Sequence, residues 1–243
     1  MDEDEEHLSK LERRFMSMPF PQVLAFCCCC CERTAPSYRA HFEGRFHLGR
    51  DVVDTALRRL WAAVDGVELQ AEETKALLAD CGRIQFAADN DTPFARSAEA
   101  ALGGIMSALT YYLERSSREA GWVAHYSTHS IVVWVDLMSN YYLGEYGSEI
   151  DDAALFRLRC VPVPALVSKE LHDARDAIYK AWLRDHPMVT AERSKQLFDL
   201  AILASVSSLT PEIVAMLRES SQTKGVQPYL RGLAARRLPE AKS

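Results

Sequence analysis

The sequence lacks the excess of basic residues that nucleic-acid-binding proteins usually carry. Its 28 lysines and arginines are outnumbered by 34 aspartates and glutamates, which gives a net charge of −6 and a pI near 5.7. Such a chain has no global positive field to attract a phosphate backbone. We therefore expect no nucleic-acid partner, and we expect a protein partner to be basic rather than acidic.

Long apolar runs and targeting signals are also missing. No stretch reaches the roughly 18 apolar residues of a membrane-spanning helix, and Ala100 to Leu113, which comes nearest, is too short. The N-terminus opens with DEDEE, whereas a secretory signal has basic residues before an apolar run. These features predict a soluble, cytoplasmic protein with no membrane span.

Familiar catalytic patterns are absent as well. The nucleophile motif G-x-S-x-G does not occur. The Gly103-Gly104 pair is too little for a phosphate-binding loop, and two glycines inside a predicted helix indicate the close approach of another helix. Whether the protein is an enzyme stays open, with a noncatalytic role favoured.

What the sequence has instead is an unusual apolar segment, Phe20 to Phe42. The ten residues from Gln22 to Cys31 carry no charge, so a helix here would be apolar nearly all round and should be buried. Pro36 is expected to end it, because a proline disfavours the helical conformation of the residue before it. Glu32 and Arg33 would then occupy the last turn, where Arg33 complements the helix dipole and the Glu32 carboxylate needs a partner.

Five consecutive cysteines, Cys27 to Cys31, close the apolar part of this segment. At about 100° per residue they point to all sides of a helix, so they cannot converge on one metal ion. S-acylation near a membrane is an alternative, but no basic cluster flanks the helix. We favour the interpretation that these thiols fill a core as small apolar groups. The odd total of seven cysteines indicates a reducing cytoplasm rather than a disulfide framework.

The same segment resembles the YjaG-like bacterial family, catalogued as domain of unknown function 416 (DUF416). In that family an apolar helix leads into a motif that reads here as Cys31-Glu32-Arg33-x-x-Pro36-x-Tyr38-x-x-Phe42. Further matches are the pair Leu60-Trp61, the step His186-Pro187-x-Val189 and the helix from Leu209 to Leu217. The resemblance covers about residues 20 to 228 and implies an all-helical fold. It brings no assigned activity with it.

Three features depart from the family pattern. They are the acidic N-terminal extension, the tandem cysteines and a longer central region from about Gly121 to Pro164.

Apolar residues recur at helical spacing along most of the chain. The clearest stripe, which Gly66 should end, is Val53, Leu57, Leu60, Trp61 and Val64. We predict an all-α fold, a single compact bundle of about eight to ten helices. Its parts would be an acidic extension with a short helix over residues 1–19, an all-helical YjaG-like domain over 20–235 and a C-terminal tail over 236–243.

Local patterns add further expectations. Residues 38–46 are expected to form a short separate helix, and Thr210-Pro211 has the residues of a helix start. The spacing of apolar residues also predicts which face of two late helices is turned toward the core. The first comprises Leu171, Ala174, Ile178, Ala181 and Trp182, and the second Leu197, Leu200, Ala201 and Ala204.

The polar group Glu32, Arg33 and Tyr38 is the preferred candidate binding site. Arg33 would hold an anion or a carboxylate of a partner through paired hydrogen bonds, with Glu32 orienting it. The competing interpretation is structural, because paired charges at a helix end also fix that end within a bundle.

A candidate metal site consists of His125, His129 and Asp136. At these spacings the three side chains share one helix face, and two imidazoles with a carboxylate suit zinc or iron. The zinc-protease pattern fails, since Tyr126 stands where it requires Glu. We expect no cofactor, and a metal ion only if a fourth ligand such as Glu99 or Glu32 comes from another helix.

Two functional hypotheses follow. The first is a noncatalytic protein that acts through protein contacts, for example an immunity or antitoxin-like protein whose acidic surface covers a basic partner. The second is a metal-dependent helical enzyme that uses the His125 helix.

Overall fold

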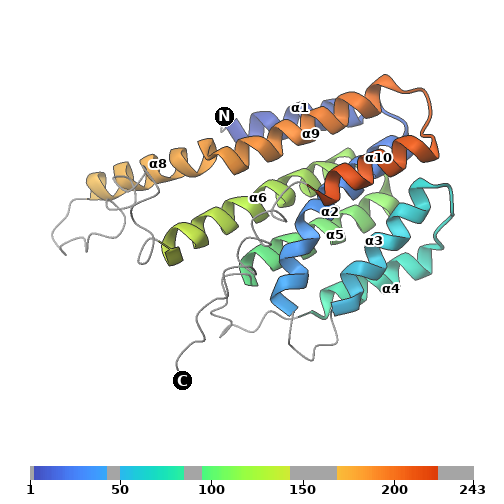
Figure 1. Ribbon diagram of the computed structural model, residues 1–243, viewed down its shortest axis with the longest axis horizontal. Coiled ribbons are helices and arrows are strands. Elements are labelled where there is room, and N and C mark those ends of the chain that lie inside the picture. Colours follow the sequence, from blue (N-terminus) through green and yellow to red (C-terminus); the bar gives the residue numbers. More distant parts are fainter. Residues whose placement is uncertain (1–2, 43–49, 85–94, 143–168, 224–243) are drawn as a thin grey trace.

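The computed structural model describes residues 3–42, 50–84, 95–142 and 169–223, and these residues form nine helices and no strand. The predicted all-α bundle is confirmed (Figure 1). The helices are α1 (Glu3–Phe15), α2 (Phe20–Phe42), α3 (Arg50–Val64), α4 (Ala71–Gly82), α5 (Ala95–Glu114), α6 (Ser117–Tyr142), α8 (Lys169–Asp185), α9 (Pro187–Ser205) and α10 (Pro211–Gln222).

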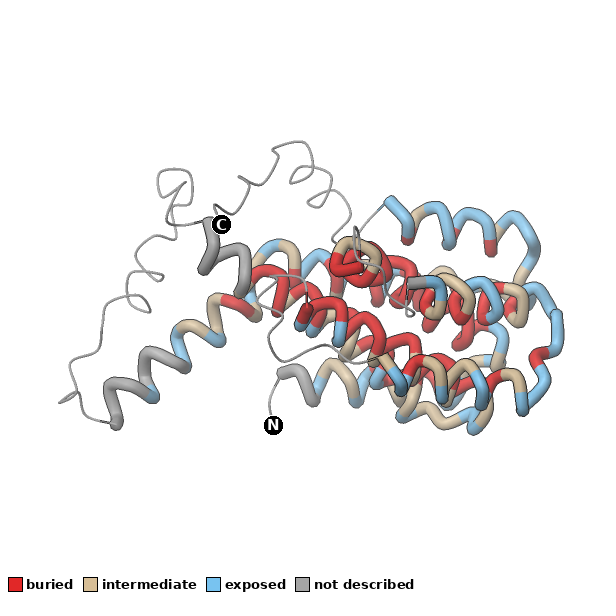
Figure 2. The backbone as a smooth tube through the Cα atoms, turned by 90° about the horizontal axis from the view of Figure 1, so that it is seen from below, coloured by how far each residue is buried: buried red, intermediate tan, exposed pale blue. Residues whose placement is uncertain are grey.

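Helix α2 is the centre of the bundle. It packs against α3, α5, α6, α9 and α10, and the side chains from Gln22 to Tyr38 are all buried. In Figure 2 the buried parts of the chain gather in the interior of the bundle, and the exposed parts lie on its outer side. Cys27 to Cys31 are at most 1% exposed and belong to the main core cluster, which confirms that these thiols serve as core side chains. A helix that is apolar all round can only be stable when neighbours cover every side of it.

The expected stop at Pro36 is wrong. Helix α2 continues through this proline to Phe42, so no separate helix begins at Tyr38. A proline inside a helix costs about 3 kcal/mol, since it removes one hydrogen bond and crowds the preceding turn. Burial of Tyr38 and Phe42 offsets this cost, and the Thr34 hydroxyl donates to the carbonyl oxygen of Cys31 at 3.2 Å. In Figure 1 the C-terminal part of α2 descends more steeply than the part before it.

The predicted inward stripe of α9 is also wrong, because the helix is turned. Leu197 is 40% exposed and Ala201 and Ala204 are exposed, while Leu200 is fully buried. The inner face carries polar side chains instead, namely Glu192, Gln196 and Asp199, which are at most 3% exposed. The apolar pattern pointed to the wrong face since the bundle needs the carboxylates inside. Ile178 in the stripe predicted for α8 is exposed as well.

Helices α5 and α6 approach each other at the two glycines, as expected. A Cβ atom added to Gly103 would lie 2.9 Å from the ring of Tyr126 on α6, so no side chain fits there without movement. Gly66 adopts a φ of 89° just after α3, and Thr210 caps α10 by accepting a hydrogen bond from Ile213. Both boundaries agree with the sequence pattern.

Other expectations lie outside the described residues. One is the tail over 236–243, and the sequence also predicts helix starts at Thr92-Pro93 and Ser168, an extended connection over 144–164 and a helix end at Gly225. Among the helices that are described, none combines the length and the apolar character needed to cross a membrane.

The two glycines offer a matched test of this helix contact. Gly103→Ala should lower the free energy of unfolding, because the new methyl group meets the Tyr126 ring. Gly104→Ala should leave stability equal or raise it by up to about 1 kcal/mol, since its Cβ would have ordinary contact at 3.6 Å and alanine favours a helix. Urea unfolding measures both variants. Equal stability of the two would show that α5 and α6 are not this close.

Candidate functional site

Arg33 lies in the middle of α2 with no exposed surface, and its guanidinium is held by two carboxylates of α9. Its Nε and Nη2 both donate to Glu192, at 2.8 to 3.0 Å, and Nη1 donates to Asp199 at 2.8 Å. Both carboxylates are buried, with side chains at most 1% exposed. Burial alone lowers the pKa of Arg33, but the attraction of Glu192 and Asp199 holds it above its ordinary value, so the guanidinium stays charged.

A second cation completes this ion-pair cluster of Arg33, Glu192 and Asp199. Lys195, one turn before Asp199 on α9, forms an ion pair with that carboxylate. Arg33, Lys195, Glu192 and Asp199 therefore sum to zero formal charge. A balanced set is the arrangement in which buried charges are least costly.

Neutral hydrogen bonds tie the cluster to further helices. Ser127 of α6 donates to Glu192 at 2.7 Å, and Gln196 donates to the same carboxylate at 3.1 Å. The Gln196 side chain also meets His7 of α1 at 3.1 Å and the carbonyl oxygen of Ala124 at 3.1 Å. One arginine thus connects α2 with α9 directly, with α6 through Glu192, and with α1 through Glu192 and Gln196.

Glu32 points to a different group of helices. Its carboxylate accepts a hydrogen bond from the indole of Trp61 on α3 at 3.0 Å, and one from Gln222 on α10 at 3.4 Å. Arg218 of α10 lies 3.4 Å from the same oxygen, and its guanidinium carbon is 5.7 Å from the centre of the Trp61 ring. The partner expected for this carboxylate is therefore present. It joins the Cys-Glu-Arg motif to the Leu60-Trp61 pair.

Tyr38 packs against the end of α2. Its ring centre is 4.6 Å from that of Phe42, and it is fully buried, which raises the pKa of its hydroxyl. Glu32, Arg33 and Tyr38 are thus all enclosed, with at most 3% of each residue exposed. The carboxylates that hold Arg33 come from its own chain, which favours the structural interpretation of this group over the binding one.

The tandem cysteines are enclosed on all sides of α2 and adjoin the ion-pair cluster, where Arg33 donates to the sulfur of Cys30 at 3.3 Å. Burial raises the pKa of all five thiols, to about 12 for Cys29. A thiol is a nucleophile or a metal ligand in its thiolate form, so a raised pKa makes these groups inert at neutral pH.

The structure does not bring the three predicted metal ligands together. His125 and His129 stack on the surface of α6, with ring centres 5.8 Å apart and planes within 6° of parallel. A metal ion lies in the ring plane of each imidazole that binds it, so parallel rings cannot share one ion without turning. Asp136 accepts a hydrogen bond from Tyr179 of α8. Burial lowers the pKa of His129, and the charges of His125 and Arg96 lower it further.

Within the described ranges no three His, Cys, Asp or Glu side chains are grouped to hold a metal ion. Metal binding by the His125 helix stays a prediction. Elemental analysis of protein purified without chelator measures it.

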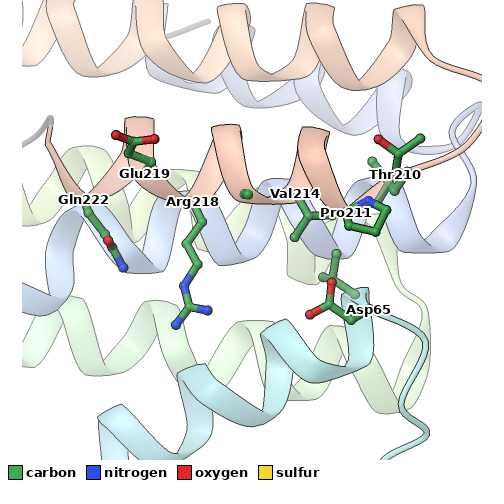
Figure 3. A pocket seen from close by; sticks show the side chains of 10 residues that line it. Asp65, Thr210, Pro211, Val214, Arg218, Glu219 and Gln222 are labelled. Atoms are coloured by element: carbon green, nitrogen blue, oxygen red, sulfur yellow. The ribbon is translucent and has the colours of Figure 1, made fainter.

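A cleft of about 650 Å³ lies between α3 and α10, and its lining includes Arg218 and Gln222, which contact the buried Glu32 (Figure 3). Its apolar lining includes Val64, Leu209 and Val214. The polar lining side chains labelled in Figure 3 are Asp65 just after α3, Thr210 just before α10, and Arg218, Glu219 and Gln222 on α10. Arg218, with 44% of its side chain exposed, connects this cleft to the buried Glu32.

A comparison with solved structures finds a DUF416 family protein from Shewanella baltica. The match has a TM-score of 0.59 at 19% sequence identity and covers 86% of this chain and 92% of that chain. The chain has the fold of a DUF416 family protein. This likeness confirms, at the level of the fold, the resemblance seen in the Cys-Glu-Arg motif. Neither a protein-family model nor a curated protein matches the sequence.

Sequence reasoning identified Glu32 and Arg33 but missed the residues that hold them. The available signal was the spacing of Glu192, Gln196 and Asp199, because residues at i, i+4 and i+7 share one helix face. Three polar residues on a face flanked by Val189 and Leu203 indicate a buried polar stripe that needs a cation opposite.

Arg33→Met should destabilise the fold by about 3 to 5 kcal/mol, because it leaves two buried carboxylates without their main partner. Arg39→Met is the matched control on the same helix. It removes a surface pair with Asp54, whose side chains are 42% and 39% exposed, and should cost less than about 1 kcal/mol. Thermal and urea unfolding measure both variants. Similar losses would contradict the assigned difference in burial.

The six described cysteines should resist thiol reagents in the folded protein at pH 8, because burial raises their pKa and blocks access. In guanidinium chloride all six should react. Labelling followed by peptide mass mapping locates each site. Rapid labelling of Cys27 to Cys31 under native conditions would be inconsistent with the dry core.

Proposed function

We propose that the protein is noncatalytic and binds a basic segment of a partner protein in the cleft between α3 and α10. The observation that carries this proposal is the composition of the cleft. Its lining includes two exposed carboxylates, Asp65 directly after α3 and Glu219 on α10, together with apolar side chains such as Val64 and Val214. In Figure 3 Asp65 lies on the α3 side of the cleft, and Glu219 projects from the outer side of α10. A lysine or arginine side chain has the matching form, with an apolar stem and a cationic end.

The single cation of the cleft does not cancel this preference. Arg218 is drawn toward the buried carboxylate of Glu32, and its guanidinium lies over the Trp61 ring. The carboxylate of Glu32 therefore largely balances the charge of Arg218. Asp65 and Glu219 are the charges left for a ligand among the residues that line the cleft.

The chain as a whole supports a basic partner. With a net charge of −6 it attracts cationic surfaces over the length of the Debye screening distance, about 8 Å at physiological ionic strength. The buried ionisable groups support a noncatalytic role. Arg33, Glu192 and Asp199 are held by one another, and the five thiols of α2 are inert at neutral pH.

An immunity or antitoxin-like protein that covers a basic toxin is the specific form of this proposal. The cleft would then take a basic side chain of the toxin, and the acidic surface around it would steer the encounter. Rescue of cell growth on co-expression with a neighbouring toxin gene tests that form directly.

Charge reversal of the cleft tests the binding proposal. Asp65→Lys with Glu219→Lys should abolish capture of basic partners from a lysate of the native host, since two repelling cations replace the attracting carboxylates. Partners bound by wild-type protein are identified by mass spectrometry.

The matched control is Glu72→Lys with Asp80→Lys, two surface carboxylates of α4 outside the cleft lining. It changes net charge equally and should keep most of the binding. An equal loss of binding in both double variants would show that binding depends on overall charge and not on the cleft. Unchanged binding in the cleft variant would refute the proposal.

A further inference from the structure

The outward face of α9 carries no charge over its whole length. Its exposed residues are Pro187, Thr190, Ala191, Ser194, Leu197, Phe198, Ala201, Ala204 and Ser205. Leu197 and Phe198 are 40% and 58% exposed. An exposed helix face usually carries charged side chains, whereas the charges of α9 lie on its buried side or at its flanks. This outward face is distinct from the cleft between α3 and α10.

The order of residues on this face is symmetric about its two large apolar members. Reversing the helix around the midpoint of Leu197 and Phe198 exchanges Ser194 with Ala201 and Ala191 with Ala204. The same reversal exchanges Thr190 with Ser205. In an antiparallel pair of such helices, small residues would therefore face small residues on both sides of the centre.

At about 100° per residue the symmetry holds around the helix as well as along it. The line through the middle of the exposed arc runs along Thr190, Ser194, Ala201 and Ser205, all small residues. Leu197 lies to one side of this line and Phe198 to the other. Small residues allow two helix axes to approach to about 8 Å, and the larger pair would flank the contact.

We propose that this face binds a second copy of the same chain, with the two α9 helices antiparallel and the two-fold axis at Leu197 and Phe198. A two-fold contact requires a surface that is complementary to itself, and the face of α9 meets this requirement in residue size. A different partner would not require the symmetry.

The size of the face limits the strength of the contact. From Thr190 to Ser205 the helix spans about 22 Å, and one helix face of this length covers much less than the roughly 800 Å² per partner of a standard interface. We therefore expect a reversible dimer with a dissociation constant of about 10 µM rather than a nanomolar one.

Analytical ultracentrifugation of the full chain, at concentrations from about 1 to 500 µM, measures the association. Wild type should move from monomer to dimer over this range. Leu197→Glu should weaken dimerisation at least tenfold, because it places two like charges beside the axis. Val67→Glu is the control, an equally drastic change at a residue 53% exposed in the α3–α4 connection, and should dimerise like wild type.

Cysteine cross-linking tests the register. Leu197→Cys should form an intermolecular disulfide with its own copy, because the two Cα atoms would lie about 5 Å apart. Thr190→Cys should not cross-link to itself, as its copy would be about 22 Å away, yet it should cross-link when mixed with Ser205→Cys. The buried cysteines of the described chain are inaccessible to this reaction.

A wild-type chain that stays monomeric at 500 µM overturns the proposal, as does a dimer that Leu197→Glu leaves intact. Efficient self-cross-linking of Thr190→Cys overturns the antiparallel register. Circular dichroism of each variant shows that the fold is retained, which is expected since every substituted side chain is exposed.

Discussion

The structure depends on one fully enclosed arginine. Arg33 stands in the middle of the most buried helix, where an unpaired guanidinium would be very costly. Two carboxylates must therefore face it from α9, and the inner side of that helix becomes polar.

Glu32 and Arg33 contact different helices of the bundle. Adjacent residues on a helix point about 100° apart, so the arginine reaches α9 while the glutamate reaches α3 and α10. The Cys-Glu-Arg motif accordingly acts as a junction that fixes helices far apart in sequence. The polar groups that are open to solvent lie in the cleft between α3 and α10. Arg218 connects this cleft with the buried Glu32.

The sequence was sufficient for what depends on local periodicity and turn residues. The helices around Leu60 and Thr210, the stop at Gly66 and the contact at Gly103 all follow from such patterns. It failed where tertiary packing outweighs a local preference, as at Pro36, which neighbouring helices hold within α2. It also failed where a buried charge decides which face turns inward, as in α9. The partners Glu192 and Asp199 lie over 150 positions from Arg33, beyond the range of any local pattern.

The most direct measurement of the role assigned to Arg33 is a double-mutant cycle with Glu192. Arg33→Met, Glu192→Gln and the double variant are unfolded in urea under the same conditions. If the two side chains form a buried pair, the double variant should be more stable than the sum of the single losses predicts, with a coupling free energy of about 2 kcal/mol or more. Additive losses, within about 0.5 kcal/mol, would contradict the central place given to this contact.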